Sequence, residues 1–146
     1  MKKIIVINGP NLNLLGKRER DIYGKNSLEE IKIQVEKKCK ELILECFFCQ
    51  SNNEGDLINF VQSTVYQFDG LIINPAAFTH TSVALLDALR AVDKPKIEIH
   101  LSNIYTREDY RKKSITSEGV NGLICGFGTL SYILAVEAIN TLINKK

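Results

Sequence analysis

Three short segments of this chain, residues 8–11, 74–80 and 98–103, carry side chains suited to acid–base chemistry, and each directly follows an apolar, strand-like run. They include the only two histidines of the sequence, His80 and His100. In an open parallel sheet the carboxyl ends of the strands lie at one edge, and ligands bind there. We therefore expect these three segments, distant in sequence, to meet in one crevice.

Glu98 and His100 have a spacing that lets one side chain orient the other. Residues two apart in a strand point to the same face, so the Glu98 carboxylate can accept a hydrogen bond from one ring nitrogen of His100. Such a bond fixes the tautomer and raises the basicity of the other nitrogen, which suits a general acid or base; the alternative is a purely structural pair. Residues 101–103 are expected to open a helix whose N–H groups suit a carboxylate ligand, with Arg111 as a further cation.

The connection over residues 9–26 shows neither a helical nor a strand period. Long loops in compact domains are usually functional, so we expect a flexible lid over about residues 17–25, where charge is dense. This lid holds Arg18 and Tyr23. Tyrosine has an ordinary pKa near 10, and a cation at about 4 Å with an effective dielectric of about 20 supplies roughly the 4 kcal/mol that would make it a base near neutral pH. From the residues alone, the assignment of base and acid stays open, with His100 suited to either.

The composition limits what the chain can be and where it works. Its 146 residues, 45% hydrophobic and 25% charged, suit one globular domain over residues 1–146. The net charge of +2 is small and the basic residues are interleaved with acidic ones, which argues against a nucleic-acid partner. The apolar run at residues 4–7 is too short for a signal-peptide core, and no run has membrane-spanning length. We expect a cytoplasmic protein without membrane association.

Motifs for metals, cofactors and redox chemistry are missing from the sequence. Cys46 and Cys49 have CxxC spacing, but in a strand such residues point to opposite faces, so all four cysteines are expected to be buried free thiols. Neither GxGxxG nor GxxxxGK[ST] occurs, and Glu98 has no acidic neighbour in its strand. We expect no metal and no cofactor.

An alternation of strand-like and helix-like patterns runs along the chain. The apolar runs predict strands over residues 2–8, 44–49, 70–74, 96–100 and 120–125. The stretches between them predict helices over residues 28–42, 55–67, 81–92, 106–113 and 129–144. Ser27 and Glu30 form a capping box for the first helix, and Val65 is expected to face inward on the second. Five strands with helical crossovers predict a three-layer α/β sandwich: a five-stranded parallel sheet, order 2-1-3-4-5, with helices on both faces.

These segments resemble the type II 3-dehydroquinate dehydratases over almost the whole chain. The similarity is densest over residues 7–16, 23–24, 50–55, 73–82, 98–103 and 122–128. The resemblance implies a flavodoxin-like fold and the trans-dehydration of 3-dehydroquinate to 3-dehydroshikimate through an enolate. The implied place is the shikimate pathway of aromatic amino acid biosynthesis, with quinate breakdown as the alternative role.

The resemblance also implies a division of labour among the site residues. Tyr23 is then the base that removes the C2 proton, and Arg18 is the lid cation that activates it. His100 is the acid that protonates the leaving C1 hydroxyl, and Glu98 orients it. Asn11 helps to hold the water that stabilises the enolate oxygen.

The same resemblance implies the substrate contacts and the assembly. Asn74, His80 and Arg111 are expected to bind substrate hydroxyls, and the backbone N–H groups of Leu101 and Ser102 its carboxylate. Asp87 is expected to reach the site of a neighbouring subunit, because the family assembles as a homododecamer built from trimers.

The chain departs from the family pattern at three places. Arg20 stands in the lid where the family often has proline, and Asn53 stands where histidine is common. Residues 114–118 lack the usual aromatic residue and proline, and we expect this segment to concern packing or subunit contact.

Three other interpretations compete with the dehydratase. A flavodoxin-like ligand-binding or signalling domain without dehydratase activity would have the same fold, since fold does not fix function. A phospho-acceptor domain, however, needs aspartates where this chain has Asn8 and Asn74, and a flavin-binding loop favours Ser or Thr after the first strand. A Schiff-base mechanism would use Lys17, which we expect to be exposed. A catalytically inactive relative would not need an intact catalytic set, which this chain has in Arg18, Tyr23, Glu98 and His100.

Overall fold

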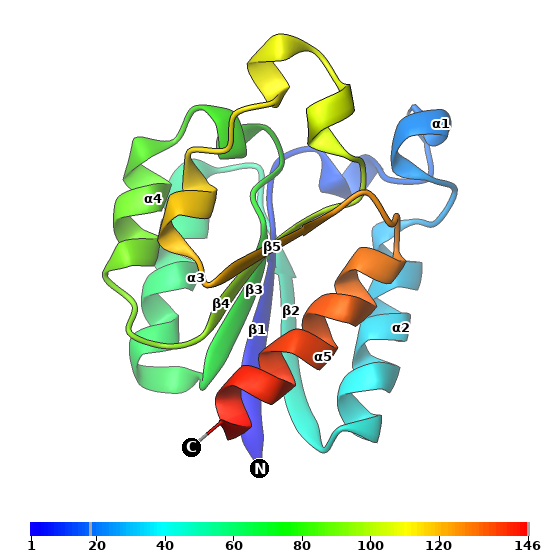
Figure 1. Cartoon of the computed structure of the whole chain (residues 1–146). Helices are drawn as coiled ribbons and strands as arrows, with labels where there is room; N and C mark the ends of the chain where they lie inside the picture. Colours follow the sequence, from blue (N-terminus) through cyan, green and yellow to red (C-terminus); the bar gives the residue numbers. More distant parts are fainter. Residues whose placement is uncertain (18, 146) are drawn as a thin grey trace.

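Five parallel strands form the centre of the computed structural model, which describes residues 1–17 and 19–145. They are β1 (Lys2–Asn8), β2 (Leu44–Gln50), β3 (Gly70–Asn74), β4 (Lys96–His100) and β5 (Gly122–Cys125). Their spatial order is β2-β1-β3-β4-β5, which confirms the predicted flavodoxin-like topology (Figure 1). The order reverses between β1 and β3, so the connections after these two strands lie beside each other at the carboxyl edge.

Helices cover both faces of this sheet (Figure 1). They are α2 (Leu28–Glu41) and α5 (Leu130–Asn144) on one face, and α3 (Glu54–Gln67) and α4 (Val83–Arg90) on the other. The short helix α1 (Arg20–Tyr23) lies beyond the end of α2 and buries no residue. Alternate side chains of β1 divide between the two core clusters: Ile4 and Val6 pack with α2 and α5, whereas Ile5 and Ile7 pack with α3 and α4. The strands therefore bury both faces, which explains why they appear in the sequence as continuous apolar runs.

Side-chain caps fix where the longer helices begin. Ser27 accepts a hydrogen bond from the Glu30 backbone at 3.2 Å, which confirms the predicted cap of α2. Asn53 accepts from Asp56 N at 3.2 Å and caps α3. The family departure at residue 53 thus still supplies a good capping side chain.

The structure corrects three details of the sequence prediction. Val65 is 37% exposed and Thr64 is buried in its place, so the inner face of α3 is rotated by one residue from the predicted one. The helix predicted over residues 106–113 is instead two 3₁₀ turns, Ile104–Thr106 and Asp109–Arg111, because Ile104 is the only buried residue of these turns and no apolar stripe stabilises a longer helix. The connection over residues 9–26 contains the 3₁₀ turn Leu12–Leu14 as well as α1.

The remaining predictions concern cysteines and membranes. All four cysteines are free, but only Cys39 is fully buried and the others are half-buried. No helix in the described ranges is both long and apolar enough to cross a bilayer. Among the described residues, no group of three or more His, Cys, Asp or Glu side chains is placed to hold a metal ion.

Candidate active site

The three predicted segments meet in one cavity at the carboxyl edge of the sheet, as expected. Its lining comes from Pro10, Asn11, Leu12, Tyr23, Asn74, Ala76, Ala77, His80, His100, Leu101, Ser102, Ile104, Arg107 and Arg111. Eight of these are residues to which the sequence assigned a role: Asn11, Tyr23, Asn74, His80, His100, Leu101, Ser102 and Arg111.

A close approach of two backbone segments brings the loops after β1 and β3 together. Gly9 N donates to Asn74 O at 2.8 Å. A Cβ on Gly9 would lie 2.5 Å from Pro75 O, so only glycine fits there without displacing the second loop. The residue type at position 9 therefore sets the distance between two walls of the cavity.

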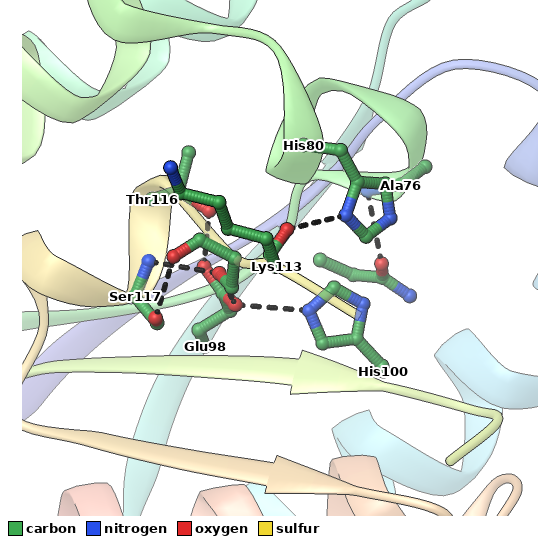
Figure 2. A network of polar contacts seen from close by, with 9 residues as sticks. Ala76, His80, Glu98, His100, Lys113, Thr116 and Ser117 are labelled. Atoms are coloured by element: carbon green, nitrogen blue, oxygen red, sulfur yellow. Dashed lines mark hydrogen bonds and ion pairs between the residues drawn. The ribbon is translucent and has the colours of Figure 1, made fainter. Parts of the chain in front are cut away.

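Glu98 and His100 form the predicted pair on one face of β4 (Figure 2). His100 Nε2 lies 2.9 Å from Glu98 Oε2, and both side chains are buried. Because an ionised carboxylate only accepts hydrogen bonds, Nε2 carries the proton and donates. Nδ1 is then the ring nitrogen available to a ligand, which gives His100 the fixed tautomer that the spacing predicted.

Two hydroxyl groups from residues 114–118 also reach Glu98. Ser114 Oγ donates to Glu98 Oε2 at 2.8 Å, and Thr116 Oγ1 donates to Glu98 Oε1. Thr116 is fully buried, which agrees with the expected packing role of the segment. Two of its side chains also bond to the carboxylate behind His100. Sequence reasoning missed this contact, because Ser and Thr are common in surface turns.

Asn74 is fixed by a series of buried hydrogen bonds that ends at the backbone of β2. Burial raises the pKa of Tyr132, so its hydroxyl keeps its proton and donates to Asn8 Oδ1 at 2.6 Å. The same hydroxyl accepts from Asn74 Nδ2 at 3.2 Å, and Asn8 Nδ2 donates to Cys49 O at 2.9 Å. Each amide is thereby fixed in one orientation. Sequence reasoning missed Tyr132, which occurs within the apolar pattern of α5.

His80 approaches the cavity with one ring nitrogen already used. Its Nδ1 lies 2.8 Å from Lys113 O and therefore donates to it (Figure 2). Burial lowers the pKa of His80, which favours the neutral ring. Its Nε2 is then an acceptor, which suits the hydroxyl of a ligand.

Tyr23 enters the cavity from α1, within the predicted lid. Its hydroxyl accepts a hydrogen bond from Arg107 Nη1 at 2.7 Å, and the guanidinium carbon lies 5.1 Å from the ring centroid. Arg107 Nη2 also lies 4.0 Å from Glu19 Oε2. Arg18 lies outside the described residues. Sequence reasoning missed Arg107; the signal that could have found it is its place just after residues 98–103, four residues before Arg111.

Of the other predicted residues, some line the cavity and others lie outside it. Glu98 is behind His100, and Asp87 is on the exposed side of α4. Leu101 and Ser102 line the cavity, but the turn that follows them is a three-residue 3₁₀ turn rather than the expected helix. Asn103 caps the start of this turn by accepting from Tyr105 N. Lys17, the residue of the Schiff-base alternative, is exposed and not part of the described lining.

The fold and the site define a flavodoxin-like α/β protein with an acid–base cavity at the topological switch point of its sheet. Two hydrogen-bonded side chains face this cavity: a tyrosine bound to an arginine, and a histidine bound to a buried carboxylate. The family model described as Dehydroquinase class II matches residues 2–140, so the chain belongs to that family.

Individual relatives agree with this family over their whole length. The chain is 50% identical over 147 residues to the 3-dehydroquinate dehydratase of Clostridium botulinum (strain Okra / Type B1), covering all of both chains. It is 48% identical to the 3-dehydroquinate dehydratase of Thermoanaerobacter pseudethanolicus, covering 97% of this chain and 96% of that one. The crystal structure of type II dehydroquinase from Butyrivibrio crossotus superposes with a TM-score of 0.94 at 44% identity, covering 95% of this chain and 97% of that one.

Proposed function

We propose that this chain is a 3-dehydroquinate dehydratase, a hydro-lyase of the shikimate pathway that converts 3-dehydroquinate to 3-dehydroshikimate and water. Membership of the class II family supports the reaction. One observation of the site carries the mechanism: Tyr23 and His100 face the same cavity, each with its own charged partner. The chain thus presents two separately activated groups, as an elimination with distinct base and acid requires.

Tyr23 acts as the base. As a tyrosinate it removes the C2 proton of the substrate, and the electron pair passes into an enolate. Arg107, with its guanidinium on the Tyr23 hydroxyl, stabilises the tyrosinate because a charge-assisted hydrogen bond favours the negative form. Arg18 adds a second cation by the family resemblance. By the same resemblance, Asn11, which lines the cavity, helps to hold the water that stabilises the enolate oxygen.

His100 acts as the acid. In its doubly protonated form it gives the Nδ1 proton to the C1 hydroxyl, which leaves as water while the enolate collapses to the enone. Glu98 stabilises the imidazolium and holds the ring in place through Nε2. After the reaction, the proton taken by Tyr23 and the one given by His100 are restored through solvent, so the cycle balances.

The remaining wall groups bind the substrate. The Asn74 amide, the neutral Nε2 of His80 and the Arg111 guanidinium contact its hydroxyl groups. The backbone N–H groups of Leu101 and Ser102 take its carboxylate. All five residues line the cavity, which supports these assignments.

The assembly and the lid complete the proposal. Asp87 is exposed on α4, where it is accessible to a neighbouring copy, and we expect the homododecamer built from trimers that the family forms. Residues 17–25 close over the bound substrate within one catalytic domain, 1–146. The enzyme works in the cytoplasm without a cofactor.

A direct assay tests this function. Purified protein is mixed with 3-dehydroquinate and the absorbance of the conjugated enone is followed, beside the variant Tyr23→Phe. A rise with the native protein that vanishes in the variant supports both the reaction and its base. No rise with folded native protein would refute the function, and an equal rise in both proteins would keep the reaction but move the base elsewhere.

A further inference from the structure

We propose that residues 113–117 form a positioning segment for both histidines of the site, with Ser114 and Thr116 holding the Glu98 side chain in one orientation against His100. The inference rests on the proposed function and adds to it residues that act through Glu98 rather than on the substrate. It starts from the side chain of Glu98, which is 0% exposed.

A carboxylate this deeply buried must be compensated by hydrogen bonds or charge. In the described part of the chain, the only ion pair of Glu98 is with His100, whose charge depends on its protonation. The other donors are the neutral hydroxyls of Ser114 and Thr116. Hydrogen bonds to the charged form of a carboxylate favour that form. The two hydroxyls therefore supply stabilisation that no lysine or arginine supplies among the described ion pairs of Glu98.

The three donors also fix the direction of the carboxylate. Oε1 accepts from Thr116, whereas Oε2 accepts from both Ser114 and His100. Because both oxygens accept hydrogen bonds, the Glu98 carboxylate cannot rotate away from the His100 ring. The imidazole then keeps its proton on Nε2, hydrogen-bonded to Glu98, and presents Nδ1 to the cavity.

The hydroxyls are themselves held by the backbone around them. Ser114 Oγ accepts from Ser117 N at 3.0 Å, so its own proton is directed to Glu98. Thr116 is fully buried at the start of the 3₁₀ turn Thr116–Gly119. A Cβ on Gly119 would lie 3.0 Å from side-chain atoms of Leu86 and Leu89, so this turn packs directly on α4.

The same segment reaches the second histidine through its backbone. Lys113 O accepts the Nδ1 proton of His80 (Figure 2). Ile115 N donates to Thr79 O at 2.8 Å. One short stretch thus sets the tautomer of His80 by a carbonyl and that of His100 through Glu98. A displacement of this stretch would disturb both histidines together.

The sharpest test replaces the Thr116 hydroxyl by a methyl group of the same size. Thr116→Val leaves Oε1 buried without its donor, so the Glu98 carboxylate can turn and no longer fixes His100. We expect kcat to fall about 10- to 100-fold, the effect of losing a hydrogen bond to a charged group, with KM little changed.

Three further variants separate positioning from packing. Thr116→Ser keeps the hydroxyl and should restore kcat, and Ser114→Ala should repeat the effect in smaller size because Oε2 retains His100. Thr64→Val is the matched control, since Thr64 is also a fully buried threonine but its hydroxyl has no partner among the described residues. It should leave kcat and KM unchanged.

Imidazole nitrogen NMR of His100 provides a readout independent of turnover. We expect one fixed tautomer, protonated at Nε2, in the native protein and in Thr116→Ser, and a mixture in Thr116→Val. If Thr116→Val folds and keeps the native tautomer and kcat, or if Thr116→Ser is as impaired as Thr116→Val, the inference is wrong. A native protein without dehydratase activity would refute the proposed function, while the NMR comparison would still decide whether Thr116 positions the ring.

Discussion

His100 and Tyr23 face one cavity but are supported in different ways. His100 ends a central strand, and its partner Glu98 is fully buried with three donors around it. Tyr23 lies in a four-residue helix without a buried residue, and its described hydrogen bond comes from Arg107, a residue of another loop. Segments with few buried contacts open at lower free-energy cost than core strands. The proposed acid is therefore built into the fold, whereas the proposed base depends on contact between the predicted lid and the loop after β4.

The largest expected effect is on the lid side. Tyr23→Phe removes the proposed base and should lower kcat about 10³-fold, within the range of general base catalysis. Because α1 buries no residue, the melting temperature should stay unchanged. Steady-state kinetics and thermal unfolding of the same preparation check both parts. A clear loss of thermal stability would show that α1 contributes to the core, and would contradict the difference between the supports of Tyr23 and His100.

On the core side, activity and stability should fall together. Glu98→Gln places an amide donor among Ser114, Thr116 and His100, so at least one donor faces another donor. We expect kcat to fall about 100-fold and the free energy of unfolding by about 1–3 kcal/mol. Kinetics and urea denaturation measure the two changes. The control is Glu19→Gln, an exposed lid carboxylate whose replacement should leave stability unchanged; equal destabilisation by both variants would remove the contrast.

Arg107 links the two regions, and its loss should affect only the base. Arg107→Gln takes away the charged donor on the Tyr23 hydroxyl, which should lower kcat near neutral pH about 10-fold. Steady-state kinetics check this, with Arg20→Gln, at an exposed residue of the predicted lid, as a charge-matched control. An effect of Arg20→Gln as large as that of Arg107→Gln would mean that net lid charge, not the specific contact, activates the base.

Tyr132 tests the core side without touching the acid pair. Tyr132→Phe leaves Asn8 Oδ1 and Asn74 Nδ2 buried without their shared partner. The free energy of unfolding should fall by about 1–3 kcal/mol, and KM should rise several-fold because Asn74 is no longer held in one orientation. Urea denaturation and substrate titration measure these changes. Tyr110→Phe, at a residue 67% exposed, should change neither; an unchanged KM in Tyr132→Phe would separate Asn74 from substrate binding.

The smallest expected effect is the pH dependence of stability from His80. Burial lowers its pKa in the folded state, so the unfolded chain takes up the proton first as the pH falls. The stability that neutral His80 contributes is therefore present above the unfolded pKa, near 6.5, and is lost below it. Melting temperatures between about pH 7 and 5 should fall more for the native protein than for His80→Gln. Parallel curves for the two proteins would contradict the burial of this ring.

The sequence was most informative where one strand or one sheet edge decides the geometry. Period-2 alternation places Glu98 and His100 on one face, and the parallel order brings residues 8–11 and 74–80 together at the switch point. These features depend on local pattern and general topology. The structure agrees with both.

The contacts that sequence reasoning missed all join elements whose relative placement depends on packing of the whole domain. Arg107 reaches Tyr23 across 84 residues and Tyr132 reaches Asn8 across 124, and neither spacing carries a period. The hydroxyls of Ser114 and Thr116 come from irregular turns, where the direction of a side chain follows from the tertiary fold rather than from spacing. The prediction that Val65 faces inward was wrong for a simpler reason. The buried face of α3 is shifted by one position, and the apolar pattern alone does not determine such a shift.

The central claim is that Tyr23 removes the C2 proton and His100 acts afterwards. Deuterium uptake by 3-dehydroquinate in D2O tests it most directly, with Tyr23→Phe and His100→Asn followed by mass spectrometry beside an enzyme-free sample. We predict that His100→Asn exchanges the C2 hydrogen into substrate while forming almost no product, because the enolate forms and returns. Tyr23→Phe should do neither. Exchange by Tyr23→Phe together with its loss in His100→Asn would contradict the account and exchange the two roles.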